Sequence, residues 1–206
     1  MDLGIDGRVA LVTGASQGIG RAIAAELVAE GARVAISSRS RERIEAAANE
    51  IGAQGFVHDT DDLDGVPDLV AGIETQLGPV DILVTNTGGP PPGADALGFP
   101  RDAWESAYRQ LVLAPIALIE QVLPGMRERR WGRIVNVSSS TVREPNPALM
   151  LSNSHRSATL AAFKTLARQV AGDGVTINSV LPGTIATRRL IDLAGSPEAA
   201  EEGARA

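Results

Sequence analysis

The sequence predicts an α/β fold built around a doubly wound parallel sheet. Short apolar segments alternate with helical patterns along the 206 residues, and the first apolar segment runs straight into a glycine-rich turn. Neither an internal repeat nor a linker interrupts this alternation. Strands covered on both faces form continuous apolar runs, and their alternation with helices gives right-handed βαβ units. We therefore expect residues 1–206 to form one domain.

Six short segments are the expected strands, and several of them are the apolar runs that a strand buried on both faces requires. In chain order they are Arg8–Thr13, Arg33–Ser38, Gly55–His58, Asp81–Asn86, Arg133–Ser138 and Val175–Val180. Ligands of such sheets bind beyond the carboxyl ends of the strands. The turns that follow these segments are therefore where we expect a site.

Helical periodicity fills the intervals between the strands. Ile19, Ile23 and Leu27 recur at i, i+4 and i+8 directly after the glycine-rich turn. An amphipathic pattern from about residue 101 to residue 126 predicts a second, long helix, and a third pattern runs from about residue 152 to residue 170. These faces are expected to pack on the sheet.

Composition excludes several classes of function. Hydrophobic residues make up 44% of the chain and aromatic residues only 3%, so Ala, Val, Leu and Ile must build the core. A net charge of −6 argues against nucleic acid or an anionic membrane as the main partner. There is no cysteine, and the two histidines lack metal-ligand spacing, so we expect no metal site. Neither a signal peptide nor a membrane-spanning run is visible, which predicts a cytoplasmic protein.

The turn at Gly14–Gly20 carries the strongest functional signal. It lies between an apolar strand and the start of a helix, where glycines let main-chain N–H groups approach a diphosphate closely. The helix dipole also favours negative charge at this end. The segment therefore predicts a Rossmann-type dinucleotide-binding domain.

The spacing Thr13-Gly14-x-x-x-Gly18-x-Gly20 resembles that of the short-chain dehydrogenase/reductase family. Further segments resemble the family in the same order along nearly the whole chain. They are Asp59-Thr60, Thr85-Asn86-Thr87-Gly88, Arg133–Ser139, Asn178 and Pro182–Thr187. Within the family, the chain is most similar to 3-oxoacyl-[acyl-carrier-protein] reductases. The resemblance implies a small-molecule carbonyl substrate and a homodimer or homotetramer formed through the two long helices.

The resemblance also implies which residues hold a nicotinamide cofactor. They are Gly14, Ser16, Gln17, Gly18, Ile19, Gly20, Ser38, Arg39, Asp59, Thr60, Asn86, Gly88, Pro182, Gly183, Ile185 and Thr187. NAD-binding members place a carboxylate after the second strand, whereas this chain has Ser37-Ser38-Arg39-Ser40-Arg41. A guanidinium with hydroxyls suits a 2′-phosphate, so we expect NADP(H). Alternatively, Arg39 and Arg41 form a solvated helix start.

The catalytic tetrad implied by the resemblance is degenerate. Ser139 stands at the serine position, but the tyrosine position 13 residues later is Ser152. The lysine position is Arg156 and the asparagine position is Leu111. A phenol has a reference pKa of about 10, whereas a serine hydroxyl is a far weaker acid. An arginine stays charged and can hydrogen-bond a ribose, but it cannot shuttle a proton.

Pro115 lies four residues after Leu111 inside the long helix. Because proline has no N–H group, the Leu111 carbonyl loses its helical partner there. We hypothesise that this carbonyl holds a water that reaches Arg156, as the family's asparagine does through its main chain.

Other acids and cations have competing interpretations. The proton donor is left open between water, Ser152 and His155, although His155 has the alternative of a partly exposed helix residue. Tyr108 is the only tyrosine, and a core position is its simpler explanation. His58 is expected to be solvated or near an adenine. Three arginines, Arg127, Arg129 and Arg130, could bind an acidic acyl carrier protein or stabilise a helix C-terminus.

The chain departs from the family again at its end. Residues 191–206 are rich in Ala, Glu and Gly, and the sequence shows no seventh strand after Val175–Val180. We therefore expect a domain truncated at its C-terminus relative to the family, with the C-terminal strand missing. The sixth strand would then leave one edge unpaired and apolar surface exposed.

Two functions remain open on the sequence. The first is an NADP(H)-dependent oxidoreductase that transfers hydride to or from a carbonyl or alcohol carbon. The second is an NADP(H)-binding pseudoenzyme with a structural or regulatory role.

Overall fold

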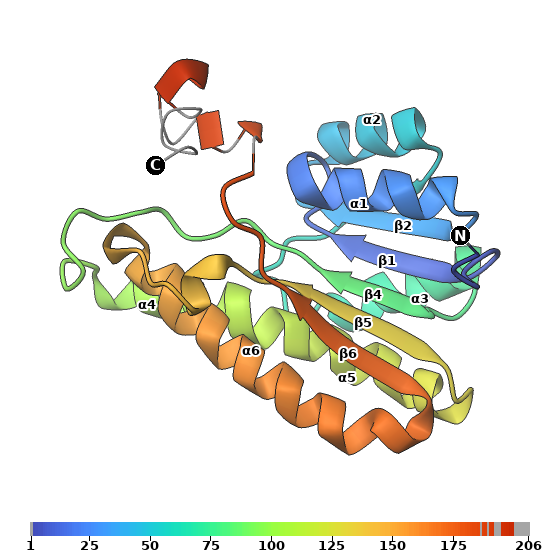
Figure 1. The fold of residues 1–206 in the computed structure, drawn as a ribbon. Helices are drawn as coiled ribbons and strands as arrows, with labels where there is room; N and C mark the ends of the chain where they lie inside the picture. The colour runs from blue at the N-terminus through green and yellow to red at the C-terminus, as the bar shows by residue number, and fades with distance from the viewer. Residues whose placement is uncertain (1, 186, 189, 192–194, 200–206) are drawn as a thin grey trace.

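A computed structural model of the protein describes residues 2–185, 187, 188, 190, 191 and 195–199. Six parallel strands form one sheet in the order β3-β2-β1-β4-β5-β6 (Figure 1). Their bounds are β1 (Val9–Thr13), β2 (Arg33–Ser38), β3 (Gln54–Val57), β4 (Ile82–Thr85), β5 (Gly132–Val137) and β6 (Val175–Val180). The predicted α/β class and all six predicted strands are confirmed, with ends that differ by at most one residue.

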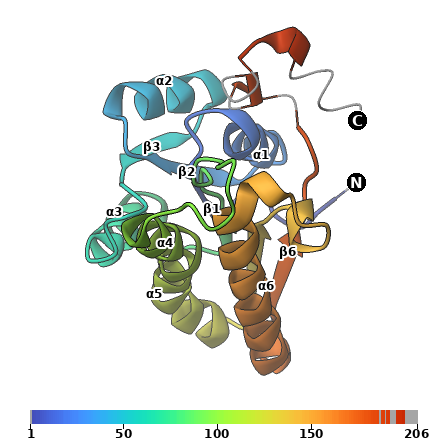
Figure 2. The ribbon, with the colours of Figure 1, turned by 90° about the vertical axis from the view of Figure 1, so that its left-hand side faces the viewer.

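Helices cover both faces of the sheet. Their bounds are α1 (Gly18–Ala29), α2 (Arg41–Ile51), α3 (Val66–Leu77), α4 (Arg101–Tyr108), α5 (Ala114–Glu128) and α6 (Met150–Val170). In the end-on view, α1 and α2 lie on one side of the strands and α3, α5 and α6 on the other (Figure 2). Two core clusters correspond to these two layers, and aliphatic side chains dominate both, as the composition predicts.

The sheet reverses its order at β1, which pairs with β2 on one side and with β4 on the other. All five residues of β1 are buried, because helices cover this central strand on both faces. The chain leaves β1 toward one face and β4 toward the other. A crevice therefore opens between their carboxyl ends, which is the topological switch point where such folds bind ligands.

The edge strand β6 pairs only with β5 among the described residues. Val180, its last residue, is 53% exposed. The predicted unpaired edge is therefore confirmed within the described residues, whereas 192–194 and 200–206 of the predicted C-terminal departure lie outside them. The described helices include none that is long and apolar enough to cross a membrane.

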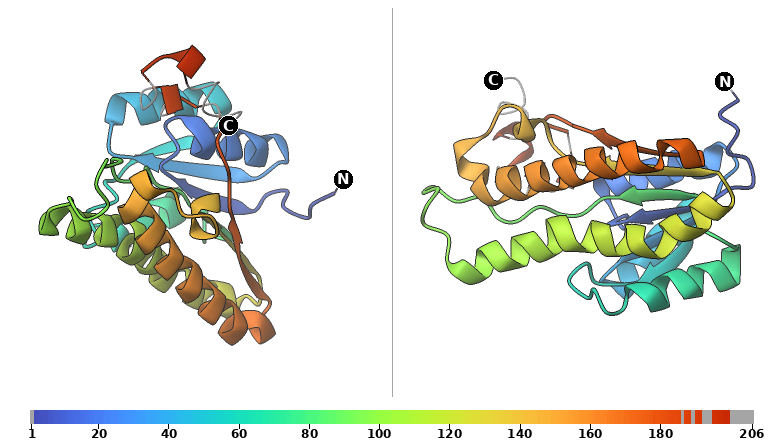
Figure 3. Two further views of the ribbon diagram at one scale, coloured as in Figure 1. Left: turned by 60° about the vertical axis from the view of Figure 1, so that its left-hand side comes forward. Right: turned by 90° about the horizontal axis from the view of Figure 1, so that it is seen from below.

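The long helix predicted over residues 101–126 is not uniform. A π-helical turn, Arg109–Leu113, separates α4 from α5, although the three segments run as one rod beside α6 (Figure 3). The main-chain N–H of Ala114 donates to the Arg109 carbonyl, five residues back, and Pro115 has no N–H to offer Leu111. The proline therefore explains the break.

The Leu111 carbonyl finds a partner on the neighbouring helix. The hydroxyl of Thr159, on α6, lies 2.5 Å from this oxygen and 3.0 Å from the His155 carbonyl of its own helix. One hydroxyl proton serves one strong bond, and the shorter contact is the interhelical one. A buried carbonyl exposed by Pro115 is thus satisfied by a side chain 48 residues away.

We predict that Thr159→Val lowers the free energy of unfolding by about 1–3 kcal/mol, because the buried Leu111 carbonyl loses its donor. Thr159→Ser is the matched control, since it keeps the hydroxyl and should be the milder change. Urea denaturation measures both. Equal losses for the two variants would mean that packing of the methyl group, and not the hydrogen bond, matters at this position.

Candidate functional site

A cleft of about 580 Å³ lies at the carboxyl ends of β1, β4 and β5. The turn after β1 forms one wall, and Gly14 and Gly18 there have φ angles of +58° and +60°. These left-handed conformations suit glycine, so the residue type fixes the shape of the turn. Gln17 caps α1 without a side-chain hydrogen bond, and the first N–H groups of α1 have no helical acceptors. The turn is thus a ready anion site.

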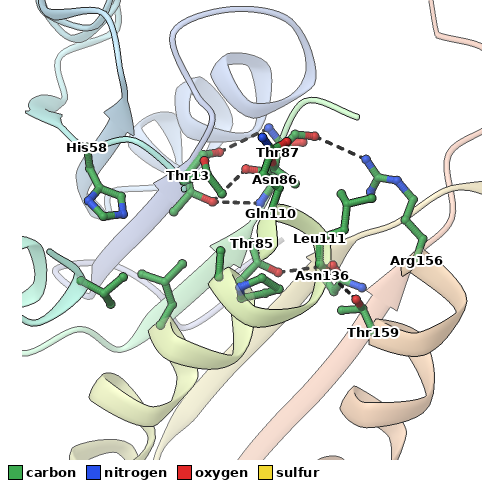
Figure 4. Close-up of a pocket in the computed structure, with 15 residues that line it drawn as sticks. Thr13, His58, Thr85, Asn86, Thr87, Gln110, Leu111, Asn136, Arg156 and Thr159 are labelled. Carbon is green, nitrogen blue, oxygen red and sulfur yellow. Dashed lines mark hydrogen bonds between the residues drawn. The ribbon is translucent and has the colours of Figure 1, made fainter. Parts of the chain in front are cut away.

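Glycine is also required where β1 and β4 approach each other. A Cβ added to Gly14 would lie 2.6 Å from the Asn86 carbonyl oxygen, and one added to Gly20 would lie 2.6 Å from the Gly14 carbonyl oxygen. The Asn86 side chain donates to the Gly14 carbonyl at 3.0 Å and to the Thr13 carbonyl at 3.3 Å. Asn86 therefore ties the turn to the end of β4 (Figure 4).

Most of the predicted cofactor residues are brought together. Fourteen of them line the cleft: Gly14, Ser16, Gln17, Gly18, Ile19, Ser38, Arg39, Asp59, Thr60, Asn86, Gly88, Pro182, Gly183 and Thr187. Gly20 and Ile185 are not among the lining residues. Gly20 packs under the turn instead, and Ile185 is 46% exposed. Their predicted contacts with a cofactor stay predictions.

The arginines that follow β2 lie in different environments. Arg39 lines the cleft, whereas the Arg41 guanidinium lies 3.2 Å from Glu45 on the exposed surface of α2. Arg43, which the sequence analysis missed, also lines the cleft. Ser40 caps α2 by accepting a hydrogen bond from the Arg43 main chain. A serine three residues before an arginine was the signal that could have placed Arg43 in the first helical turn.

The three predicted catalytic residues line the same cleft. Ser139 Oγ accepts hydrogen bonds from the Thr141 N–H at 3.2 Å and from the Thr141 hydroxyl at 3.0 Å. Ser152, in the first turn of α6, accepts one at 3.1 Å from Nε of Arg156. Both serines thus use a lone pair within the protein, and their own protons remain to be donated.

Arg156 joins the ends of two strands. Its Nη1 donates to the Val137 carbonyl at 2.9 Å and approaches the Ser138 carbonyl at 3.4 Å, at the end of β5. Its Nη2 reaches the Thr87 carbonyl after β4 at 3.4 Å (Figure 4). The guanidinium is therefore held in place by several main-chain acceptors. Its predicted contact with a ribose stays a prediction.

The Leu111 carbonyl is released by Pro115, as expected, and the Thr159 hydroxyl donates to it. Leu111, Arg156 and Thr159 line a second, smaller cavity, and Leu111 and Thr159 are absent from the lining of the cleft itself. A carbonyl oxygen has two lone pairs, so the bond from Thr159 leaves one acceptor position. The hypothesis that this carbonyl holds a water that reaches Arg156 stays a prediction.

Two predictions for the aromatic side chains are wrong. His155 is 8% exposed and not a surface residue, because its Nδ1 lies 2.7 Å from the Leu151 carbonyl and its ring contacts Trp104 and Tyr108. Tyr108 is 46% exposed and not a core residue. Neither side chain lines the cleft. His155 therefore packs between α6 and α4, outside the cleft.

Three arginines at the end of α5 bind the protein itself. Arg127 lies 2.6 Å from Asp173, Arg129 donates to the Val80 carbonyl, and Arg130 donates to the Gly172 carbonyl. These contacts favour the explanation that they stabilise a helix C-terminus. Within the described residues, no three His, Asp or Glu side chains gather as a metal site would require.

The fold and the cleft define a class of protein. A parallel sheet with a glycine-rich turn at its switch point, facing a helix N-terminus, is a nucleotide-binding α/β architecture. Residues 8–195 match the short-chain dehydrogenase family, and the chain belongs to it.

The chain is similar to a broad set of dehydrogenases and reductases. It is 32% identical over 185 residues to the 3-oxoacyl-[acyl-carrier-protein] reductase of Haemophilus influenzae, covering 89% of this chain and 76% of that protein. L-Sorbose reductase from Gluconobacter frateurii, solved with NADPH and L-sorbose, has a TM-score of 0.89 at 32% identity and matches 94% of this chain and 76% of that one. An NAD⁺-bound xylitol dehydrogenase has a TM-score of 0.86 at 25% identity, and the match covers 97% of this chain and 84% of that one. Across curated relatives, the chain spans 60% to 76% of their lengths.

His58, at the end of β3, offers a test of the electrostatics near the site. Burial lowers the pKa of His58 below 6.5, and this outweighs the opposing effect of Asp62 and Asp59. The unfolded chain therefore binds more protons than the folded protein just below pH 6.5, so stability is lost as the pH falls through this window. We predict that the difference in unfolding free energy between wild type and His58→Gln shifts against the wild type from pH 7.5 to 5.5 in urea melts. A constant difference would contradict this assignment.

Proposed function

We propose that this protein is an NADP(H)-dependent oxidoreductase acting on a carbonyl or alcohol carbon of a small molecule. The observation that carries the proposal is the glycine turn at the switch point, in a cleft that Arg39 and Arg43 after β2 and the two serines Ser139 and Ser152 also line.

The described residues fit a nicotinamide dinucleotide. Four arginines line the cleft, and Asp59 is the only carboxylate among the described lining residues, in a chain whose net charge is −6. The cleft thus concentrates positive charge where phosphates would lie. Ser138 Oγ is buried beside it with no hydrogen-bond partner among the described residues, which is a polar atom that a ligand can satisfy.

Each part of the cleft has a role in this proposal. The amides of the Gly14–Gly20 turn hold the diphosphate, Asp59 and Thr60 lie at the adenine end, and Pro182–Thr187 flanks the nicotinamide. Residue 186 of this last segment lies outside the described residues. A bound nicotinamide would supply the hydride chemistry, and the protein positions it. Ser139 would then donate a hydrogen bond to the substrate oxygen.

A preference for the 2′-phosphate rests on Arg39 and Arg43, since both line the cleft after β2. Guanidinium groups bind phosphate through charge-assisted hydrogen bonds, and the described lining offers no carboxylate at that position. Related structures contain either coenzyme, because the sorbose reductase holds NADPH and the xylitol dehydrogenase holds NAD⁺. The preference is thus argued from this chain's own arginines.

We propose further that the protein is cytoplasmic and forms a homodimer or homotetramer through α4, α5 and α6. A 3-oxoacyl thioester is the substrate to test first, because of the similarity to a 3-oxoacyl-[acyl-carrier-protein] reductase. Docking of an acyl carrier protein on Arg127, Arg129 and Arg130 has little support, since all three make intramolecular contacts.

We predict that Arg39→Ala and Arg43→Ala each raise the Kd for NADPH about tenfold and leave the Kd for NADH nearly unchanged. Arg41→Ala is the matched control, because that guanidinium pairs with Glu45 outside the cleft. Fluorescence titration of the reduced coenzymes measures all three variants. An equal loss for NADH and NADPH, or tighter binding of NADH by the wild type, would contradict the 2′-phosphate assignment.

The second candidate function is an NADP(H)-binding pseudoenzyme. The observation that favours it is the replacement of the family's phenol, ammonium and amide by Ser152, Arg156 and Leu111. A panel of ketones and 3-oxoacyl thioesters, followed by NADPH oxidation, separates the two functions. We expect slow but measurable turnover. NADPH binding without any turnover would leave the pseudoenzyme as the answer.

A further inference from the structure

The cleft contains few groups that could act as an acid. Among the described residues that line it, the titratable side chains are four arginines and Asp59. The arginines stay charged, and Asp59 is at the opposite, adenine end of the proposed site. Reduction of a carbonyl nevertheless requires one proton for each hydride. The donor must therefore be a hydroxyl group or a water.

His155 is removed from this choice by its environment. Its Nδ1 lies 2.7 Å from the Leu151 carbonyl and its ring contacts Trp104 and Tyr108. It is buried on the side of α6 that faces α4, whereas Ser152 and Arg156 line the cleft. Of the donors that the sequence left open, Ser152 and water remain.

Ser152 can hydrogen-bond a proton donor, but its side chain is too short to protonate the substrate oxygen itself. Arg156 Nε occupies one lone pair of Ser152 Oγ at 3.1 Å, and the hydroxyl proton is left to donate. A serine hydroxyl ends roughly 4 Å short of the place that a phenol oxygen at the same position would reach. A water hydrogen-bonded to Ser152 Oγ at about 2.8 Å fills most of this gap, and its proton reaches a substrate oxygen that binds about 1 Å closer to α6 than it would beside a phenol.

We propose that Ser152 anchors a water that acts as the proton donor, with Arg156 fixing the anchor. This inference rests on the proposed oxidoreductase function. Arg156 is well placed to fix it, because the carbonyls of Val137 and Thr87 hold its guanidinium. The positive charge nearby also stabilises negative charge that develops on the substrate oxygen.

A bound reduced nicotinamide would supply the hydride that the carbonyl carbon gains and would itself be oxidised, while the carbonyl π electrons become a lone pair on oxygen. An O–H bond of the anchored water breaks as its proton joins this oxygen. The remaining hydroxide takes a proton from bulk solvent through the cleft. Ser139 donates a hydrogen bond throughout and keeps its proton.

The first test is kinetic. Ser152→Ala should lower kcat for carbonyl reduction about 100-fold, the lower end of the range for loss of a positioned donor, while the Kd for NADPH stays unchanged. Ser157→Ala is the matched control, because its hydroxyl donates to the Asn153 carbonyl and it does not line the cleft. Unchanged turnover in a folded Ser152→Ala protein that binds NADPH overturns the proposal.

A second test uses the wild type alone. Alcohol oxidation should accelerate with pH through pH 9 without levelling, because the proton acceptor derives from water and not from a group of ordinary pKa. The double variant Ser152→Tyr with Arg156→Lys should level off, since it introduces a titrating phenol. Levelling in the wild type below pH 9 would assign the proton to another group and overturn the proposal.

A third test needs no turnover. A crystal structure at high resolution should contain an ordered water within hydrogen-bond distance of Ser152 Oγ, and Ser152→Ala should lose it. Its absence in the wild type overturns the proposal. Failure of NADPH to bind would overturn the oxidoreductase function itself. Binding without turnover of any carbonyl would overturn the oxidoreductase function together with the water-donor step and favour the pseudoenzyme, whereas loss of the water-donor step alone would appear as unchanged turnover in Ser152→Ala.

Discussion

The contact between the ends of β1 and β4 is the constraint on which the site depends. Asn86 donates to the main-chain carbonyls of Thr13 and Gly14, and the Thr13 hydroxyl bonds the Asn86 main chain in return. These hydrogen bonds hold the carboxyl ends of β1 and β4 together at the switch point. Only glycine fits at residues 14 and 20, because any Cβ there would collide with the same groups. The anion-binding turn is thus shaped by the strand next to it.

Helix α6 secures the other wall of the cleft with side chains from one face. Arg156 bonds main-chain carbonyls after β4 and β5, and Thr159, one turn later, bonds the Leu111 carbonyl of the π-helical turn. Each contact joins a side chain of α6 to a main-chain carbonyl of another part of the chain. Arg156 and Thr159 therefore contribute to the framework of the site.

The arginines of the chain fall into two groups, one at the base of the sheet and one in the cleft. Arginines at the base of the sheet, Arg8 and Arg129, neutralise the buried Asp81, and Arg8 also lies 4.1 Å above the Trp131 ring. The arginines in the cleft face a lining that is almost free of carboxylates among the described residues. An acidic protein thus presents a local positive field where phosphates would bind, and its remaining arginines serve its stability.

The sequence alone determined the fold class, the strands and the glycine turn, because hydrophobic periodicity and glycine spacing are local properties of the chain. It also located most of the cleft, since the carboxyl ends of parallel strands meet at one edge. Only the tertiary structure separated Arg41 from Arg43, because the rotation of α2 decides which side chain faces the cleft. It alone paired Thr159 with Leu111 and buried His155 against Trp104. These contacts join residues far apart in the sequence, and helix packing, which leaves no local pattern, brings them together.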